Sequence, residues 1–84
     1  MKKIKYSKHA LEQMMERGAE KEEVDEAISK GEKVPAKKGR QAYRLNFQYD
    51  RIWGETWYHI KQVMPIVKEE ENELTVVTIY VFYF

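Results

Sequence analysis

The sequence predicts an α+β domain in which two N-terminal helices pack on one face of a three- to four-stranded antiparallel sheet. Apolar residues recur with helical spacing up to about residue 30, and they alternate with polar residues from residue 43 onward. Two helices followed by three or four strands form a meander whose face the helices can cover. The 84 residues suffice for one domain, 1–84, with a modest core.

The first helix is predicted over residues 8–17. Ser7 is a suitable N-cap, and Gly18 is typical of the position just past a helix end. The apolar stripe of this helix consists of Ala10, Leu11, Met14 and Met15. His9 lies almost opposite the centre of this stripe, so we do not expect a core histidine. His9 is therefore either a functional group or a second cap for the helix end.

The second helix is predicted over residues 21–30, and Gly31 ends it. The residues expected to face inward are Val24, Ala27 and Ile28, with Ala19 packed against Val24 across the helix start. The acidic run Glu20, Glu22 and Glu23 fits a solvated first turn better than a metal site, because the helix dipole favours acids there.

Three strands are predicted over residues 43–49, 56–67 and 74–83, and residues 4–6 can add a short edge strand. Pro65 indicates a bulge or an edge position near the end of the second strand. The last strand is apolar on both faces, so we expect it in the middle of the sheet or covered on both sides.

Strict alternation predicts which side chains face away from the helices. The expected inward sets are Tyr43, Leu45 and Phe47, then Tyr58, Ile60, Gln62 and Met64, and finally Val77, Ile79 and Val81. The open face then carries Arg44, His59, Lys61, Thr78 and Tyr80. Cations, an imidazole, hydroxyls and an aromatic ring suit a phosphodiester and a stacked base, although a plain solvent-exposed face carries similar residues.

Charge is distributed unevenly along the chain. Residues 1–45 hold 12 Lys/Arg and 8 Asp/Glu, whereas residues 46–84 hold 3 and 6. The basic residues concentrate in Lys2, Lys3, Lys5 and Lys8, and again in Lys37, Lys38, Arg40 and Arg44. Two such clusters can frame a phosphate path, or they can simply be solvated lysines that keep a small protein soluble.

The first helix also carries a possible catalytic pair. His9 lies in the first turn, where free N–H groups and the helix dipole attract a phosphate. An imidazole near its pKa and the arginine at position 17 could cleave RNA without metal. Ordinary surface helices carry the same residues.

Several other chemistries are not supported. There is no cysteine, and neither His9 nor His59 has a carboxylate at ligand spacing, so no metal site and no cofactor are expected. The glycines form no phosphate loop, and no signal peptide or membrane span is recognisable, which predicts a cytoplasmic protein. Trp53 and Trp57 flank a loop, where packing over a sheet edge is favoured over base stacking.

The order and spacing of several runs resemble the bacterial family called domain of unknown function 4258. The runs are SKHALEQMMERGAEKEEVDEAISKGE, YRLNF, WYHIKQV and ELTVVTIY, with His9-Ala10, Arg17-Gly18 and Thr78 at the positions of the family's hallmarks. The resemblance implies the ribonuclease fold of RelE and ParE toxins, barnase and colicin tRNases, and with it a small metal-independent endoribonuclease or toxin. Ala19-Glu20 departs from the family pattern and should weaken the cap of the second helix.

Two functions remain open at this point. In an endoribonuclease, His9 or His59 would take the 2′-hydroxyl proton, while a cation among Arg17, Arg44 and Lys61 would stabilise the phosphorane. Thr78 or Tyr80 would position the phosphate. The RNA contacts would come from Lys8, Lys37, Lys38, Arg40 and Arg44. The alternative is a non-catalytic module that binds RNA or a protein.

The partners expected from the sequence are RNA, a cognate antitoxin protein and a second copy of the chain. The second copy would pair through the apolar C-terminal strand, because an unpaired apolar strand end invites pairing. No membrane partner is expected.

Overall fold

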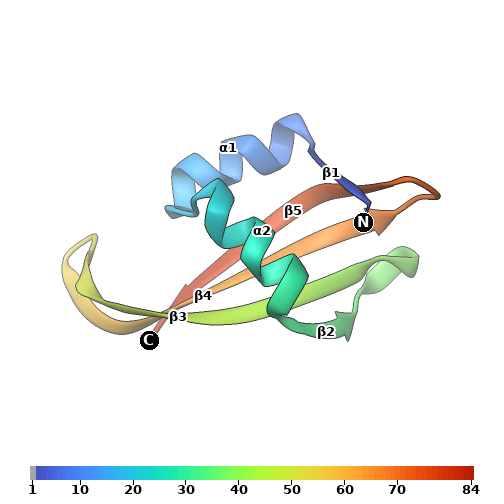
Figure 1. Ribbon diagram of the computed structural model, residues 1–84. Helices are drawn as coiled ribbons and strands as arrows, with labels where there is room; N and C mark the ends of the chain where they lie inside the picture. The colour runs from blue at the N-terminus through green and yellow to red at the C-terminus, as the bar shows by residue number, and fades with distance from the viewer. Residues whose placement is uncertain (1) are drawn as a thin grey trace.

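The computed structural model describes residues 2–84, in which two helices cover one face of a five-stranded sheet (Figure 1). The elements are β1 (Lys3–Tyr6), α1 (Lys8–Arg17), α2 (Lys21–Lys30), β2 (Glu32–Pro35), a 3-10 turn η1 (Lys37–Gly39), β3 (Gln41–Trp53), β4 (Thr56–Glu69) and β5 (Glu73–Tyr83). The strand order is β1-β5-β4-β3-β2. The α+β class is thus confirmed.

The sheet differs from the prediction in strand number and direction. It has five strands rather than three or four, and it is mixed, because β1 runs parallel to β5. β2 was not anticipated, since two of its four residues are charged and it ends in Pro35. It pairs antiparallel with the start of β3, from Glu32 opposite Arg44 to Pro35 opposite Gln41.

Helix α1 has the bounds and caps that its sequence predicts. The Ser7 hydroxyl accepts a hydrogen bond from the Ala10 amide at 3.0 Å. Gly18 ends the helix with a left-handed φ of 78°. A Cβ at Gly18 would lie 2.6 Å from a ring carbon of Trp53 and 2.9 Å from the Tyr83 hydroxyl, so both backbone geometry and space require glycine here.

Helix α2 also has its predicted bounds, and its start is better capped than expected. The Glu20 amide donates to the Glu23 carboxylate at 2.9 Å, which satisfies one of the free N–H groups of the first turn. Ala19 and Val24 are both buried in the same apolar cluster. Among residues 2–84, no helix has the length and apolar character needed to cross a membrane.

The predicted faces are correct for β3 but reversed for β4. Tyr43 and Phe47 of β3 pack against the core, as predicted. In β4 the core residues are Val63 and Val67, with the buried Lys61 beside them, whereas Gln62 and Met64 were expected there. In β5, Ile79 and Val81 face inward as predicted, but Val76 rather than Val77 is the buried valine.

Bulges cause these shifts, because each extra residue exchanges the two faces of a strand. One bulge lies at His59 and Ile60 of β4, whose amides both donate to the Phe84 carbonyl, at 2.7 and 3.0 Å. The pairing of β4 with β5 passes from Ile66–Thr78 to Val67–Val76 and so skips Val77.

Pro65 lies in β4, the second of the three predicted strands, as expected, but β4 is a central strand of the sheet rather than an edge strand. β4 is flanked by β3 and β5. The pairing of β3 with β4 goes from Ala42–Ile66 to Leu45–Val63 and is interrupted across Pro65, which has no N–H to donate.

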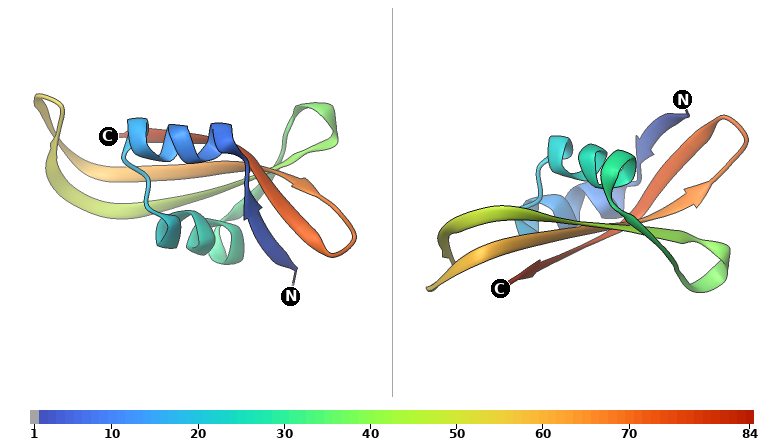
Figure 2. Two further views of the ribbon diagram at one scale, coloured as in Figure 1. Left: turned by 90° about the horizontal axis from the view of Figure 1, so that it is seen from above. Right: turned by 60° about the horizontal axis from the view of Figure 1, so that its bottom comes forward.

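The outer edge of β5 changes its partner along its length. β1 pairs with Glu73–Val76, and the Ser7 amide then donates to the Val76 carbonyl at 2.9 Å. Beyond this point α1 runs along the strand, and the C-terminal end of β5 emerges past the end of α1 (Figure 2). The last strand is therefore interior only in its first half.

Candidate nucleic-acid interface

A tight turn between β2 and β3 presents three cations. The turn is closed by hydrogen bonds from the Ala36 amide to the Arg40 carbonyl at 3.0 Å and from the Arg40 amide to the Lys37 carbonyl at 3.3 Å. Its central residues, Lys38 and Gly39, both have positive φ, 61° and 71°. This geometry suits a hairpin, but a left-handed lysine costs roughly 1–2 kcal/mol relative to glycine.

The turn forms one wall of a pocket of about 310 Å³. The opposite wall is made by Ile66 of β4 and by Thr78 and Tyr80 of β5, on the face away from the helices. The lining residues are Ala36, Lys37, Lys38, Arg40, Ile66, Thr78 and Tyr80, which we call the basic pocket. Five of the residues singled out in the sequence thus meet here, although they come from segments some forty positions apart.

Arg17 reaches the same region from the end of α1. Its Nη1 donates to the Ile79 carbonyl at 2.6 Å, and its guanidinium carbon lies 5.3 Å from the centre of the Tyr80 ring. The side chain therefore crosses the outer edge of β5 and meets the open face. A cation held against an aromatic ring in this way offers both charge and a stacking plane.

Gln13 positions this arrangement and was missed as a functional residue. It is buried, and its Oε1 accepts a hydrogen bond from the Ile79 amide at 2.8 Å. Gln13 and Arg17 thus satisfy both backbone groups of Ile79 from two successive turns of α1. The available signal was a polar residue directly before the buried Met14, which indicates a side chain that needs a polar partner.

His9 is exposed in the first turn of α1. It lies one turn before Gln13 and two turns before Arg17, on the same side of the helix. The N-cap bond comes from Ser7, and no side-chain hydrogen bond or ion pair of His9 is found within residues 2–84. Lys8, beside it, is also exposed.

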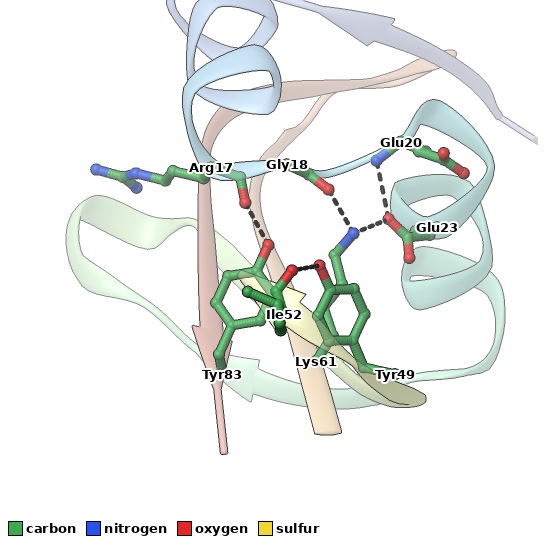
Figure 3. A network of polar contacts seen from close by, with 8 residues as sticks. All are labelled: Arg17, Gly18, Glu20, Glu23, Tyr49, Ile52, Lys61 and Tyr83. Carbon is green, nitrogen blue, oxygen red and sulfur yellow. Dashed lines mark hydrogen bonds and ion pairs between the residues drawn. The ribbon is translucent and has the colours of Figure 1, made fainter. Parts of the chain in front are cut away.

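Lys61 lies on the helix-facing side, opposite to its predicted face. It is only 3% exposed, and its Nζ donates to the Gly18 carbonyl and to Glu23 Oε1, the latter at 2.7 Å. Figure 3 shows these two bonds. Beside them, the Tyr83 hydroxyl donates to the Arg17 carbonyl at 2.7 Å. The Arg17 guanidinium points away from all three bonds in this view. Lys61 therefore ties the sheet to the junction of the two helices.

His59 lies at the other end of β4, near the β3–β4 hairpin. Its side chain is 74% exposed, and Nδ1 is 3.2 Å from Asp50 Oδ1. Seven residues separate His59 from Ile66, which is about 23 Å along a strand. A hydrogen bond from Gln48 at 2.6 Å, followed by that from His59, lowers the pKa of Asp50. His59 therefore lies well away from the basic pocket.

The tryptophans of the hairpin pack against neighbouring rings. The Trp53 ring stacks on Tyr83 with centroids 5.0 Å apart and an interplanar angle of 12°. Trp57 meets His59 edge to face at 4.4 Å. The preference for packing over base stacking thus agrees with their positions.

Arg44 faces away from the helices, but its charge is paired with that of Glu32. Its guanidinium forms hydrogen bonds with Glu32 Oε1 on the neighbouring strand, one of them at 3.0 Å through Nε. Arg44 is therefore a weaker anion partner than the three cations of the turn, which have no ion pair within residues 2–84.

A larger hollow of about 580 Å³ lies between α2 and β1, on the helix side. Its apolar walls include Ile4, Ile28, Tyr43 and Leu74. The charges at its rim are paired with each other, Lys2 with Glu69 at 3.2 Å and Lys30 with Glu26 at 3.3 Å. It offers little for a phosphate, and within residues 2–84 no three acidic, histidine or cysteine side chains form a metal-binding group. The basic pocket is therefore the candidate site.

Comparison with known proteins gives a family and no closer relative. A family model described as "Domain of unknown function (DUF4258)" matches residues 6–81, which is nearly the whole chain. No curated protein and no solved structure matches the sequence or the fold. The matched range contains α1, the basic turn and the Thr78–Tyr80 segment of β5.

Proposed function

The chain belongs to the DUF4258 family, and from the basic pocket we propose that this domain binds single-stranded RNA. The observation that carries the proposal is the meeting of Lys37, Lys38 and Arg40 with the hydroxyls of Thr78 and Tyr80. Cations recognise phosphates, and hydroxyl groups can bond a phosphate oxygen or a ribose 2′-hydroxyl.

The aromatic residues beside the pocket favour single strands over duplexes. Tyr80 and Phe82 are 40% and 41% exposed, and their rings lie nearly parallel, 15° apart, with centroids at 6.3 Å. A base can stack on such a ring, or on the Arg17 guanidinium, only when it is not already stacked in a helix. Phosphates would follow the basic turn while the bases lie over β5.

Metal-independent cleavage of the bound RNA is a second candidate. The observation that favours it is the exposed His9 on the same side of α1 as Arg17. A neutral His9 would remove the 2′-hydroxyl proton, and Arg17 would stabilise the negative charge of the phosphorane. The 2′-oxygen bonds to phosphorus, the bond to the 5′-oxygen breaks, and a protonated group supplies the proton to that leaving oxygen. The products are a 2′,3′-cyclic phosphate and a free 5′-hydroxyl.

Fluorescence anisotropy with labelled RNA oligonucleotides tests the binding proposal. The parent should bind single-stranded RNA with an affinity that falls steeply with salt. Replacing Lys37, Lys38 and Arg40 by alanine should weaken binding to all sequences. Because single strands release about 0.7 counterion per phosphate contact, the slope of log K against log salt should shrink by about 2.

A charge-matched variant provides the control. Replacing Lys3, Lys5 and Lys21 by alanine removes the same charge from exposed positions on β1 and α2. Binding should be nearly unchanged in that variant. Equal losses in both variants would show that net charge rather than the basic pocket attracts RNA, and undetectable binding of the parent at low salt would refute the proposal.

A further inference from the structure

The outer edge of β5 is closed as far as Ile79 and open beyond it. At Ile79, the amide donates to Gln13 at 2.8 Å and the carbonyl accepts from Arg17 at 2.6 Å, so both backbone groups point away from β4. Five residues later, Phe84 exchanges two hydrogen bonds with Ile60 of β4, at 2.9 and 3.0 Å, so its backbone groups point toward β4.

Successive residues of a strand direct their backbone groups to opposite sides. Val81 and Tyr83 therefore direct their N–H and C=O groups outward, as Ile79 does. β1 lies beside β5 only from Glu73 to Val76, and within residues 2–84 no other strand or side chain bonds these four groups. Figure 2 shows the C-terminal end of β5 at the rim of the sheet, past the end of α1.

We propose that this edge pairs with the same edge of a second copy of the chain. The two β5 strands would run antiparallel about a two-fold axis at Phe82. Val81 would then lie opposite the partner's Tyr83, and each such pair exchanges two hydrogen bonds. All four outward groups of each copy would be satisfied by the symmetric contact.

The segment itself favours a second copy as the occupant. Residues 80–84 read Tyr-Val-Phe-Tyr-Phe and carry no charged side chain, so the two-fold brings no like charges together. Phe82 would face the partner's Phe82, and Phe84, 62% exposed, would face the partner's Tyr80. Aromatic cross-strand pairs of this kind stabilise antiparallel sheets.

Helix α1 sets the register of the contact. Gln13 and Arg17 occupy the backbone groups of Ile79, so pairing with a partner strand stops at Tyr80. The overlap therefore begins at Tyr80, and a slip by two residues toward Ile79 would leave the outward groups of Tyr83 without a partner. Pairing in this register also places the basic pockets of both copies on the same face of one continuous sheet.

Sedimentation velocity tests the proposal with purified protein from about 10 µM to about 1 mM, the range in which a small interface associates. The parent should shift from monomer to dimer across this range. Phe82→Lys places two like charges across the axis at an exposed position and should remain monomeric at every concentration. Val81→Pro removes an outward N–H that the monomer does not use, and it should do the same.

Circular dichroism and melting temperatures check that both variants stay folded, and Ile52→Lys serves as the matched control. Ile52 is 64% exposed in β3, which β4 separates from β5 in the sheet, so this variant should dimerise like the parent. A parent that stays monomeric at the highest concentration overturns the proposal. So does a dimer that survives in both edge variants, or that Ile52→Lys abolishes equally. None of these measurements involves RNA, so the result is independent of the proposed function.

Discussion

Lys61 and Glu23 form an ion pair that is almost removed from water, 2.7 Å from Nζ to Oε1, between the middle of β4 and the first turn of α2. The Lys61 side chain is 4% exposed and that of Glu23 is 19% exposed. The same Glu23 oxygen accepts from the Glu20 amide, and the same Nζ donates to the Gly18 carbonyl. This pair thus links the junction of the two helices to the middle of the sheet.

Lys61→Met should lower the free energy of unfolding without changing the affinity for RNA. The variant leaves the Glu23 carboxylate without its main partner, and removing one member of such a pair costs roughly 2–4 kcal/mol. Urea unfolding measures the loss, and anisotropy with RNA measures binding below the transition. The double variant Lys61→Met/Glu23→Met should recover part of the stability. A normal stability combined with lost RNA binding or cleavage would instead make Lys61 a functional cation.

Lys38→Gly should separate charge from backbone strain in the basic turn. Glycine relieves the left-handed conformation, which we expect to raise the unfolding free energy by about 0.5–1 kcal/mol after its own entropy cost. RNA affinity should fall, because one of the three pocket cations is lost. Lys37→Gly is the control, since Lys37 has no positive φ: it loses the same charge and should gain no stability. Equal stability changes in the two variants would contradict the strain argument.

His9→Ala tests the cleavage mechanism. The His9 side chain is exposed and Ser7 supplies the helix cap, so stability should change by less than about 0.5 kcal/mol. Cleavage of a mixed RNA in the presence of a chelator should fall by about 10²–10⁴-fold, the usual cost of losing a general base. Glu12→Ala, exposed on the same helix, should retain activity. A parent that binds RNA but never cleaves it would leave the domain as a binding module.

The raised pKa of Tyr83 predicts that the protein loses stability at alkaline pH. Burial, together with nearby Tyr49, raises the pKa of Tyr83 to about 12, whereas an unfolded tyrosine titrates near 10. The folded state therefore favours the neutral phenol. This stabilisation is complete below about pH 10 and is lost as pH rises through about 12.

Urea unfolding of the parent and of Tyr83→Phe at about pH 9 and about pH 11.5 measures this effect. The variant loses the hydrogen bond to the Arg17 carbonyl, so it should be less stable at the lower pH. It should then lose less stability than the parent between the two pH values. The same decline in both proteins would assign the alkaline loss to other groups.

The helices could be predicted from the sequence almost to the residue. Ser7 and Gly18 are local signals, since each acts through its own backbone geometry and within one helical turn. The faces of β4 could not be predicted in this way. A polar residue such as Lys61 indicates the solvent side only when it has no buried partner, and its partner Glu23 lies 38 positions away.

The candidate site was predictable in part. The basic turn and the Thr78–Tyr80 segment could each be recognised, but their meeting depends on β2, which carries the turn over the sheet. Alternation alone predicted the open-face positions of Thr78 and Tyr80, but it did not predict the bulge at Val77, which puts Val76 instead of Val77 in the core. Such bulges follow from long-range pairing, and no residue type near Val77 signals one.

Gly18 also limits how far this sequence can change. The end of α1, the hairpin residue Trp53 and the β5 residue Tyr83 all approach the space where a side chain would begin. Gly39 and Gly54 also have positive φ, but no atom lies within 4 Å of a Cβ placed there, so asparagine or aspartate is acceptable at both. A saturation library selected for folding should therefore retain glycine alone at position 18 and a mixture of residues at the two turns. Three segments that lie far apart in the sequence thus share one constraint at position 18.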